Sequence, residues 1–103
     1  MVRKKTIGLR LGQKVTSMQG RDYGQEFLVV GFIDDSILLV ADGKKRSVKR
    51  PKKKNIKHIS ISLKVDEPIE NKLSTGGQVT DDEIYKAIQR LGERMEEGEI
   101  SIG

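Results

Sequence analysis

Short apolar runs separated by polar turns occupy the first two thirds of the chain. The segment QKVTSMQ (13–19) alternates as a strand does, with Val15, Ser17 and Gln19 on one face and Thr16 and Met18 on the other. EFLVVGFI (26–33) is rich in β-branched and aromatic residues and predicts a strand that is buried on much of both faces. ILLVA (37–41) follows after a polar DDS turn, so residues 27–41 predict a β-hairpin.

Two more strands complete the predicted sheet. The pair Asp42-Gly43 predicts a type I′ turn, because aspartate and glycine tolerate the positive φ angles of that turn. KRSVK (45–49) and IKHISIS (56–62) predict two short strands, joined through Pro51, which cannot donate a ladder hydrogen bond. Five short strands with tight turns favour a mainly β fold, a small antiparallel barrel that closes its own edges.

The last third of the chain changes to a helical pattern. Pro68 and the pair Gly76-Gly77 interrupt residues 65–79, which predict a linker with a short helical turn at residues 69–73. After the linker, the apolar residues fall at i, i+3, i+4, i+7 and i+11, which is one face of an amphipathic helix. These residues are Ile84, Ala87, Ile88, Leu91 and Met95.

The ends of this helix are marked by its polar residues. Thr80 and Glu83 have the spacing of a capping box, and Gly98 is placed to end the helix. The glutamates of the last turn oppose the helix dipole, so this turn is predicted to fray. The predicted organisation is a basic N-terminal segment (1–10), a barrel domain (11–64), a linker (65–79), an acidic amphipathic helix (80–98) and a tail (99–103).

Charge is distributed unevenly along the chain. The net charge is +5, but residues 1–57 carry 15 Lys/Arg against 5 Asp/Glu, whereas residues 58–103 carry 5 against 10. Nine of the basic residues lie between Lys44 and Lys57, and crowding of like charge at this density is relieved by a polyanion through counterion release. We interpret this basic run as a nucleic-acid-binding surface; a solvated surface or a nuclear-import-like run is the alternative.

The residues needed for most catalytic and metal sites are missing or scattered. One histidine and no cysteine exclude Cys–His catalysis, disulfides and thiolate zinc sites. There is no GxSxG elbow and no P-loop, and the carboxylates lie mostly in the predicted C-terminal helix, so we expect no enzymatic activity, cofactor or metal. The apolar runs are far shorter than the roughly 20 residues that span a bilayer, and nothing resembles a signal peptide. A cytoplasmic protein is expected.

Two glycines flank an arginine and a tyrosine in the segment GRDYG (20–24). A helix-packing face would need apolar neighbours and a P-loop would need a following Lys-Ser/Thr, and the segment has neither. We interpret GRDYG as the bend between the first two strands, with Gly20 and Gly24 providing positive φ angles or room for a phosphate. Tyr23 is suited either to stack on a base or to pack its ring on the barrel rim.

The order of these features resembles the KOW motif. GQKVTSMQGRDYGQEFLVVGFI, followed by ILLVADGKKRSVKRPKKKNIKHI, looks like the bacterial KOW-domain RNA-binding proteins that are related to KOW-bearing proteins of the large ribosomal subunit. The resemblance covers about residues 11–60. It implies an SH3-like barrel that binds RNA, usually ribosomal, through its KOW loops and basic strands. Tyr23 departs from the family pattern, in which this position is often small or charged.

The main hypothesis is a non-catalytic protein that binds structured or ribosomal RNA and is associated with the ribosome. A surface rich in lysine and poor in aromatic residues suits RNA that is recognised by its backbone and shape. The predicted turn residues are Gly20, Gly24, Asp42 and Gly43, and for His58 a hydrogen bond to the backbone is the alternative to an RNA contact. The predicted RNA contacts are Arg21, Tyr23, Lys44, Lys45, Arg46, Lys49, Arg50, Lys52, Lys53, Lys54, Lys57 and His58.

A second hypothesis is a protein-interaction module of the transcription or translation machinery. In this hypothesis the C-terminal helix offers Ile84, Ile88 and Leu91 to a ribosomal or transcription protein. The alternative for this stripe is docking on the chain's own barrel, because amphipathic helices usually bury their apolar face within their own domain. A third possibility is that the acidic tail lies over the basic surface and competes with RNA.

Overall fold

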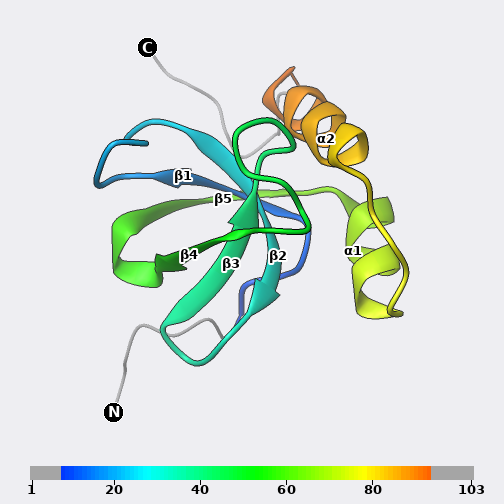
Figure 1. Ribbon diagram of the computed structural model, residues 1–103, viewed down its shortest axis with the longest axis horizontal. Helices are drawn as coiled ribbons and strands as arrows, with labels where there is room; N and C mark the ends of the chain where they lie inside the picture. The colour runs from blue at the N-terminus through cyan, green and yellow to red at the C-terminus, as the bar shows by residue number, and fades with distance from the viewer. Residues whose placement is uncertain (1–7, 94–103) are drawn as a thin grey trace.

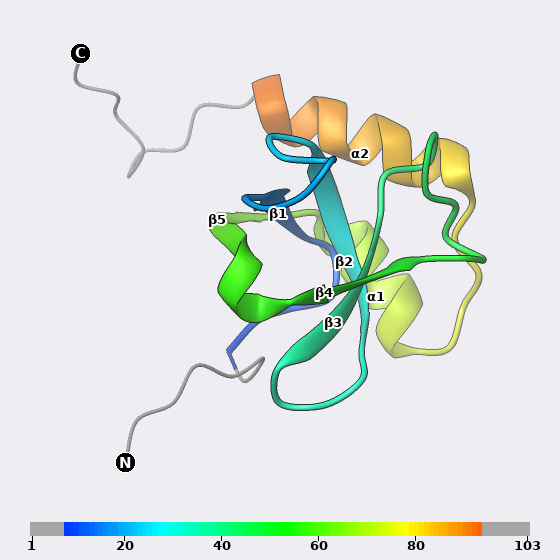
Figure 2. The same ribbon diagram turned by 60° about the vertical axis from the view of Figure 1, so that its left-hand side comes forward.

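The computed structural model describes residues 8–93, which form five antiparallel strands in one sheet and two α-helices (Figure 1). The spatial order β4-β3-β2-β1-β5 is a meander until the last strand, which returns to pair with β1. A 3-10 helix (Ile56–His58) connects β4 to β5, and the sheet curls into a small SH3-like barrel (Figure 2). The strands are β1 (Gln13–Ser17), β2 (Glu26–Phe32), β3 (Ile37–Ala41), β4 (Lys52–Asn55) and β5 (Ile59–Val65). The predicted fold class, mainly β with a five-stranded barrel and a C-terminal helix, is confirmed.

The last two predicted strands are misplaced. Residues 45–49 form a loop, and the fourth strand is β4, whose three consecutive lysines have low strand propensity. β4 forms because the backbone of β3 offers it a full antiparallel partner. The strand predicted at 56–62 begins only at Ile59, because residues 56–58 form the 3-10 helix. Asn55 caps this helix, since its side-chain oxygen accepts a hydrogen bond from the Lys57 backbone N–H.

The sheet carries a hydrophobic cluster on each of its faces. Successive side chains of a strand point to opposite faces, so Phe27 and Val29 enter the barrel while Leu28 points toward the helices. The predicted burial of this strand on both faces is therefore confirmed. The inner cluster consists of Val15, Phe27, Val29, Leu38, Val40 and Ile56, and the outer cluster of Leu28, Ala41, Ile69, Val79, Ile84, Ala87 and Leu91.

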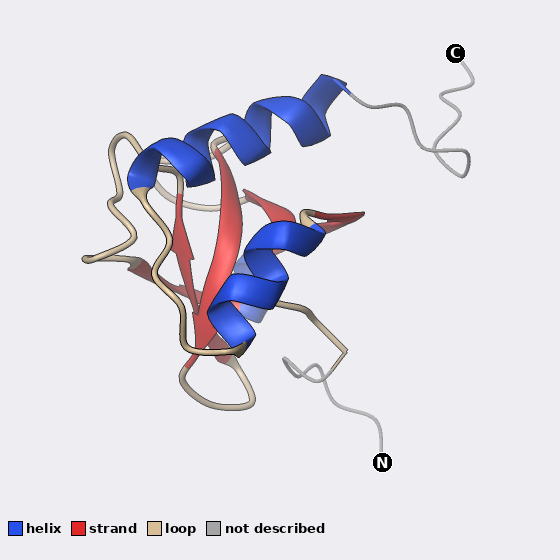
Figure 3. Cartoon of the chain, turned by 90° about the vertical axis from the view of Figure 1, so that its right-hand side faces the viewer, coloured by secondary structure: helices blue, strands red, loops and turns tan. Residues whose placement is uncertain are grey.

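Both helices lie on the same outer side of the sheet (Figure 3). α1 (Glu67–Ser74) falls in the segment expected to be a linker and extends the short helical turn predicted there. α2 (Asp81–Glu93) begins with the predicted capping box. Glu83 Oε1 accepts a hydrogen bond from the Thr80 backbone N–H at 2.9 Å, and Thr80 Oγ1 accepts one from the Glu83 N–H at 3.1 Å.

The apolar stripe of α2 docks on the chain's own sheet. Ile84, Ala87 and Leu91 are almost completely buried in the outer cluster, and Ile88 is packed against it. The stripe is therefore part of the core of this domain. Met95 and the predicted helix end at Gly98 lie outside the described residues.

Asp66 holds the two helices together from a buried position. Its carboxylate caps α1 by accepting a hydrogen bond from the Ile69 backbone N–H at 3.1 Å. It also forms an ion pair with Arg90 of α2. One buried side chain thus fixes both the start of α1 and its position relative to α2.

Candidate nucleic-acid interface

Much of the predicted basic run lies in the long loop between β3 and β4, and a buried aspartate shapes the start of this loop. Asp42 Oδ1 accepts hydrogen bonds from the backbone N–H groups of Lys44 and Arg46, at 2.9 and 2.8 Å. Gly43 has φ of +80°, but Asp42 does not have positive φ, since only glycines do in the described part of the chain. The type I′ turn predicted at Asp42-Gly43 is therefore wrong, because that turn needs positive φ at both positions.

The same loop is anchored on the first turn of α2. Asp81 Oδ1 accepts a hydrogen bond from the Val48 N–H at 2.7 Å, and its Oδ2 accepts one from Ser47 Oγ at 3.0 Å. A Cβ atom on Gly43 would lie only 2.3 Å from the Asp81 carbonyl oxygen and 2.9 Å from the Tyr85 backbone nitrogen. The loop therefore lies directly against the helix, and its lysines and arginines extend from a fixed backbone.

GRDYG forms the connection between β1 and β2. Gly20 and Gly24 both have φ of +86°, a conformation that is costly for residues with a Cβ. The loop closes through two backbone hydrogen bonds, from the Tyr23 N–H to the Gly20 carbonyl at 3.2 Å and from the Gly24 N–H to the Ser17 carbonyl at 2.7 Å. Arg21 and Tyr23 are exposed at its tip.

Asp22, in the centre of this loop, forms ion pairs with two lysines of strand β4. Its carboxylate lies 3.0 Å from the Nζ atoms of both Lys52 and Lys54, and it accepts a hydrogen bond from Ser17 Oγ at 3.0 Å. Partial burial favours a raised pKa for Asp22, but the hydrogen bonds from Lys52, Lys54 and Ser17 outweigh it and hold the pKa of this carboxyl well below its ordinary range. We name this arrangement of Asp22, Ser17, Lys52 and Lys54 the Asp22 clasp.

Two of the predicted RNA contacts, Lys52 and Lys54, take part in the clasp. The Lys54 side chain is only 8% exposed and also donates to the Gln19 carbonyl oxygen at 3.3 Å, so its charge is directed into the protein. Lys52 is partly exposed and shares the same carboxylate. Lys53 lies between them in β4 and is exposed, and strand alternation directs its side chain to the opposite face.

Basic residues from separate segments meet at a surface cavity of about 320 Å³, which we name the basic hollow. Arg21 comes from GRDYG, Lys45 and Arg46 come from the β3–β4 loop, and Lys52 comes from β4. The remaining wall is formed by Asp22, Gln25 and Phe27. The acid in this wall is Asp22, whose charge is already paired in the clasp.

The other predicted contacts do not line the basic hollow. Lys49, Arg50 and Lys57 are exposed, on the β3–β4 loop and on the 3-10 helix. Tyr23 is 66% exposed. The backbone carbonyl of His58 accepts a hydrogen bond from the Met18 N–H at 2.8 Å, and its side chain is partly buried.

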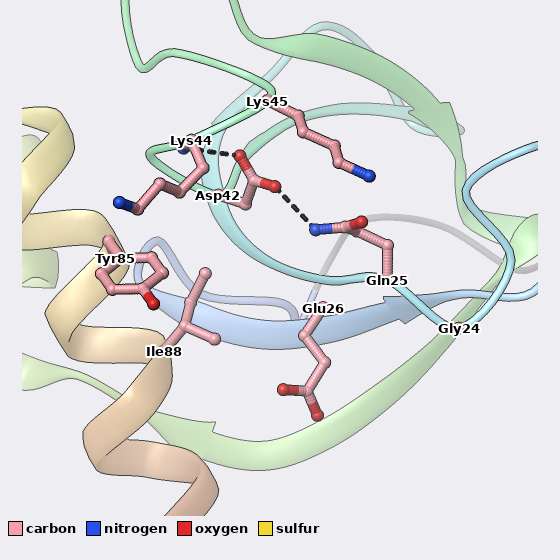
Figure 4. Close-up of a pocket in the computed structure, with 8 residues that line it drawn as sticks. All are labelled: Gly24, Gln25, Glu26, Asp42, Lys44, Lys45, Tyr85 and Ile88. Atoms are coloured by element: carbon pink, nitrogen blue, oxygen red, sulfur yellow. Dashed lines mark hydrogen bonds between the residues drawn. The ribbon is translucent and has the colours of Figure 1, made fainter.

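A second cavity, of about 380 Å³, adjoins the basic hollow, because Gln25 and Lys45 line both (Figure 4). We name it the tyrosine cavity, after Tyr85 of α2. Lys44 Nζ lies 4.4 Å from the centroid of the Tyr85 ring, a cation–π contact. Sequence reasoning missed Tyr85, because its position next to the apolar stripe marks it only as a helix residue. The tyrosine joins the site because Gly43 brings the loop onto the helix.

Two classes of feature are not found in the described part of the chain. Among residues 8–93 no group of three or more His, Asp or Glu side chains is placed to hold a metal ion. Within the same residues, neither helix has the length and apolar character needed to cross a bilayer.

Comparison with known proteins places the chain in a family. No family model matches it. It is 37% identical over 70 residues to the Bacillus subtilis protein named "Putative ribosome-binding protein YbzG", a match that covers 68% of this chain and 95% of that protein. The chain belongs to the YbzG family.

The YbzG-family chain also has archaeal relatives. It is 29% identical over 84 residues to the large ribosomal subunit protein eL14 of Desulfurococcus amylolyticus, covering 82% of this chain and 80% of that protein. It is 27% identical over 82 residues to eL14 of Pyrobaculum islandicum, covering 80% and 73% respectively. These matches confirm the resemblance of the YbzG-family chain to KOW-type, ribosome-related proteins.

Proposed function

We propose that this protein is a non-catalytic, ribosome-associated protein that binds structured ribosomal RNA through the basic hollow. The observation that carries the proposal is the convergence of Arg21, Lys45, Arg46 and Lys52 on one cavity from three separate segments of the fold. Asp22 cancels only part of this charge, because its single carboxylate is shared between Lys52 and the nearly buried Lys54.

The family relationship supports the choice of the ribosome. The Bacillus subtilis relative is named as a ribosome-binding protein, and the archaeal relatives are named as proteins of the large ribosomal subunit. A protein with such a partner would act in the cytoplasm.

The chemistry of the surface favours RNA that is recognised by its backbone. Lysine binds a phosphate as a point charge, whereas arginine adds the paired geometry of its guanidinium group. Double-stranded RNA exposes phosphates and 2′-hydroxyl groups across a shallow minor groove. A cavity lined by both cations is thus suited to the RNA backbone, with affinity that depends little on sequence.

The experiment measures binding of the full chain to a hairpin of ribosomal RNA by fluorescence anisotropy at several salt concentrations. If four to six phosphates are neutralised, log K falls against log salt with a slope of about −3 to −5. Co-sedimentation with purified large ribosomal subunits tests the ribosomal partner. A flat salt response, or no co-sedimentation, overturns the corresponding part of the proposal.

A pair of double variants locates the binding surface. Lys45→Gln with Arg46→Gln removes two charges from the basic hollow and is expected to make the salt slope shallower by about 1.5 to 2. Lys72→Gln with Lys86→Gln removes the same number of charges from the helices, where both lysines form exposed ion pairs. Equal losses of affinity in the two double variants would contradict a site at the basic hollow.

The alternative role of the C-terminal helix has less support. The stripe that would bind a partner protein is buried between α2 and the sheet. Competition of the acidic tail with RNA stays a hypothesis, because Glu96, Glu97 and Glu99 lie outside the described residues.

A further inference from the structure

The tyrosine cavity has chemistry that backbone binding to duplex RNA does not use. It lies between the β3–β4 loop, the start of β2 and α2, with Tyr85 and Ile88 on the helix side and Gln25 across from them (Figure 4). Its volume of about 380 Å³ is at the lower end of the range for small-molecule sites, roughly 300–1,000 Å³. A flat apolar group with polar edges matches this lining.

The β3–β4 loop is fixed against the helix that carries Tyr85. Gly43 allows the loop to contact the first turn of α2, and the hydrogen bonds to Asp81 fix the loop there. Tyr85 is partly buried beside the outer hydrophobic cluster, and Lys44 lies next to its ring. An aromatic ring with adjacent cations is the combination by which proteins bind unpaired nucleotides, with bases on the aromatic groups and phosphates on the basic ones.

The charged residues that line the tyrosine cavity determine at which end a phosphate would bind. Lys44 and Lys45 lie on the loop side, and Lys45 also lines the basic hollow. The Asp42 carboxylate lies between them and accepts hydrogen bonds from the Lys44 and Arg46 backbone N–H groups and from Gln25 Nε2 (Figure 4). Glu26 lies on the opposite side, where it pairs with Lys14 at 2.8 Å. The two lysines outnumber the single, hydrogen-bonded Asp42 carboxylate on the loop side, so a phosphate is attracted to that side and repelled from the Glu26 side. The space beside Tyr85 and Ile88 is left for a base.

We propose that the tyrosine cavity binds one unpaired nucleotide of the RNA, with its base on Tyr85 and Ile88 and its phosphate between Lys44 and Lys45. This inference rests on the proposed function, since it assigns a second subsite next to the basic hollow. The protein then prefers helical RNA that carries an unpaired nucleotide over a continuous duplex. Shape and charge recognise the duplex, and the tyrosine cavity recognises the defect.

The experiment compares two hairpin RNAs with the same stem, one of them carrying a single bulged nucleotide. The full chain is expected to bind the bulged hairpin about 5- to 150-fold more tightly, the range that corresponds to roughly 1–3 kcal/mol of base stacking. Tyr85→Leu is expected to abolish this preference, so that the variant binds the two hairpins equally. Tyr85→Phe keeps the ring and is expected to retain the preference.

A second measurement does not depend on replacing Tyr85. In Tyr23→Phe, Tyr85 is the only tyrosine of a chain that has two tyrosines and no tryptophan. Its fluorescence is expected to be quenched by the bulged hairpin and much less by an equal amount of the continuous one. Equal quenching by both hairpins overturns the inference.

The outcomes separate this inference from the proposed function. If the unaltered chain binds neither hairpin, the proposed function itself fails. If the chain binds both hairpins equally, or if Tyr85→Leu keeps the preference, only the tyrosine cavity is refuted as a nucleotide site. If Tyr23→Leu removes the preference instead, the stacking residue is in GRDYG and the assignment to Tyr85 is wrong.

Discussion

Replacing Asp22 by asparagine tests the Asp22 clasp. The substitution keeps the size of the side chain and removes its charge, which leaves the nearly buried Lys54 ammonium without its anion. An exposed ion pair contributes roughly 0–1 kcal/mol, whereas breaking a buried pair costs about 3–5 kcal/mol. Because Asp22 is itself 16% exposed and Lys52 reaches solvent, we expect an intermediate cost of about 2–3 kcal/mol in the free energy of unfolding.

The assay is thermal and urea unfolding followed by circular dichroism. For a domain of this size the expected cost lowers the Tm by roughly 10–20 °C. Asp82→Asn is the matched control, because Asp82 forms an exposed ion pair with Lys86 on α2, and it is expected to cost less than about 1 kcal/mol.

A double-mutant cycle assigns the cost to the contact with Lys54. In a Lys54→Met background the buried ammonium is absent, so Asp22→Asn is expected to cost less than half as much as in the unaltered chain. The reasoning is refuted if Asp22→Asn costs no more than Asp82→Asn, or if its cost is the same in both backgrounds.

Three further predictions concern stability. The pKa of Asp22 is lowered in the folded protein from its ordinary value of 3.8. The stability that the Asp22 charge contributes is therefore complete above that pH and is lost progressively as the pH falls below it. The Tm difference between the unaltered chain and Asp22→Asn should be constant from about pH 7 to pH 5 and shrink below about pH 4. Gly43→Ala should lower the free energy of unfolding by more than about 2 kcal/mol in urea, since the new Cβ would meet the Asp81 carbonyl oxygen. Gly24→Ala has open space around it and should cost only about 1 kcal/mol, for its positive φ. Equal costs would contradict the close contact between loop and helix. Asp66→Ala should cost about 2 kcal/mol or more in the same assay, because the substitution removes the cap of α1 and the ion-pair partner of Arg90 in α2. A cost below about 0.5 kcal/mol would show that Asp66 does not join the helices.

The sequence pattern predicted the fold class because hydrophobic alternation and turn residues are local properties. The burial of β2 on both faces and the capping box at Thr80 both followed from such patterns. The position of β4 could not be predicted in this way. Three consecutive lysines carry no strand signature, and the strand exists because β3 pairs with it and because Lys52 and Lys54 meet Asp22.

The composition of the basic surface was visible in the sequence, but its geometry was not. The density of basic residues in the sequence identified the basic run, but it does not distinguish Lys54 from Lys45. Lys54 is buried in an ion pair, whereas Lys45 is exposed at the basic hollow. The sequence pattern marks Asp22 only as part of a turn. Tyr85 is distant in sequence from the basic run and joins it through the contact of Gly43 with α2, which no local pattern encodes.

The return of β5 to β1 has a consequence for how the chain folds. Strands β1 to β4 pair with their neighbours in sequence, through connections that span residues 18–25, 33–36 and 42–51, whereas Val15 and its partner Ile61 are 46 positions apart. Closing such a loop costs more chain entropy than closing a hairpin, and it must occur before the contact gives any stability. Barrel closure is therefore expected to limit the folding rate, and substitutions at the β1–β5 pairing should slow refolding in stopped-flow experiments more than substitutions in the β2–β3 hairpin.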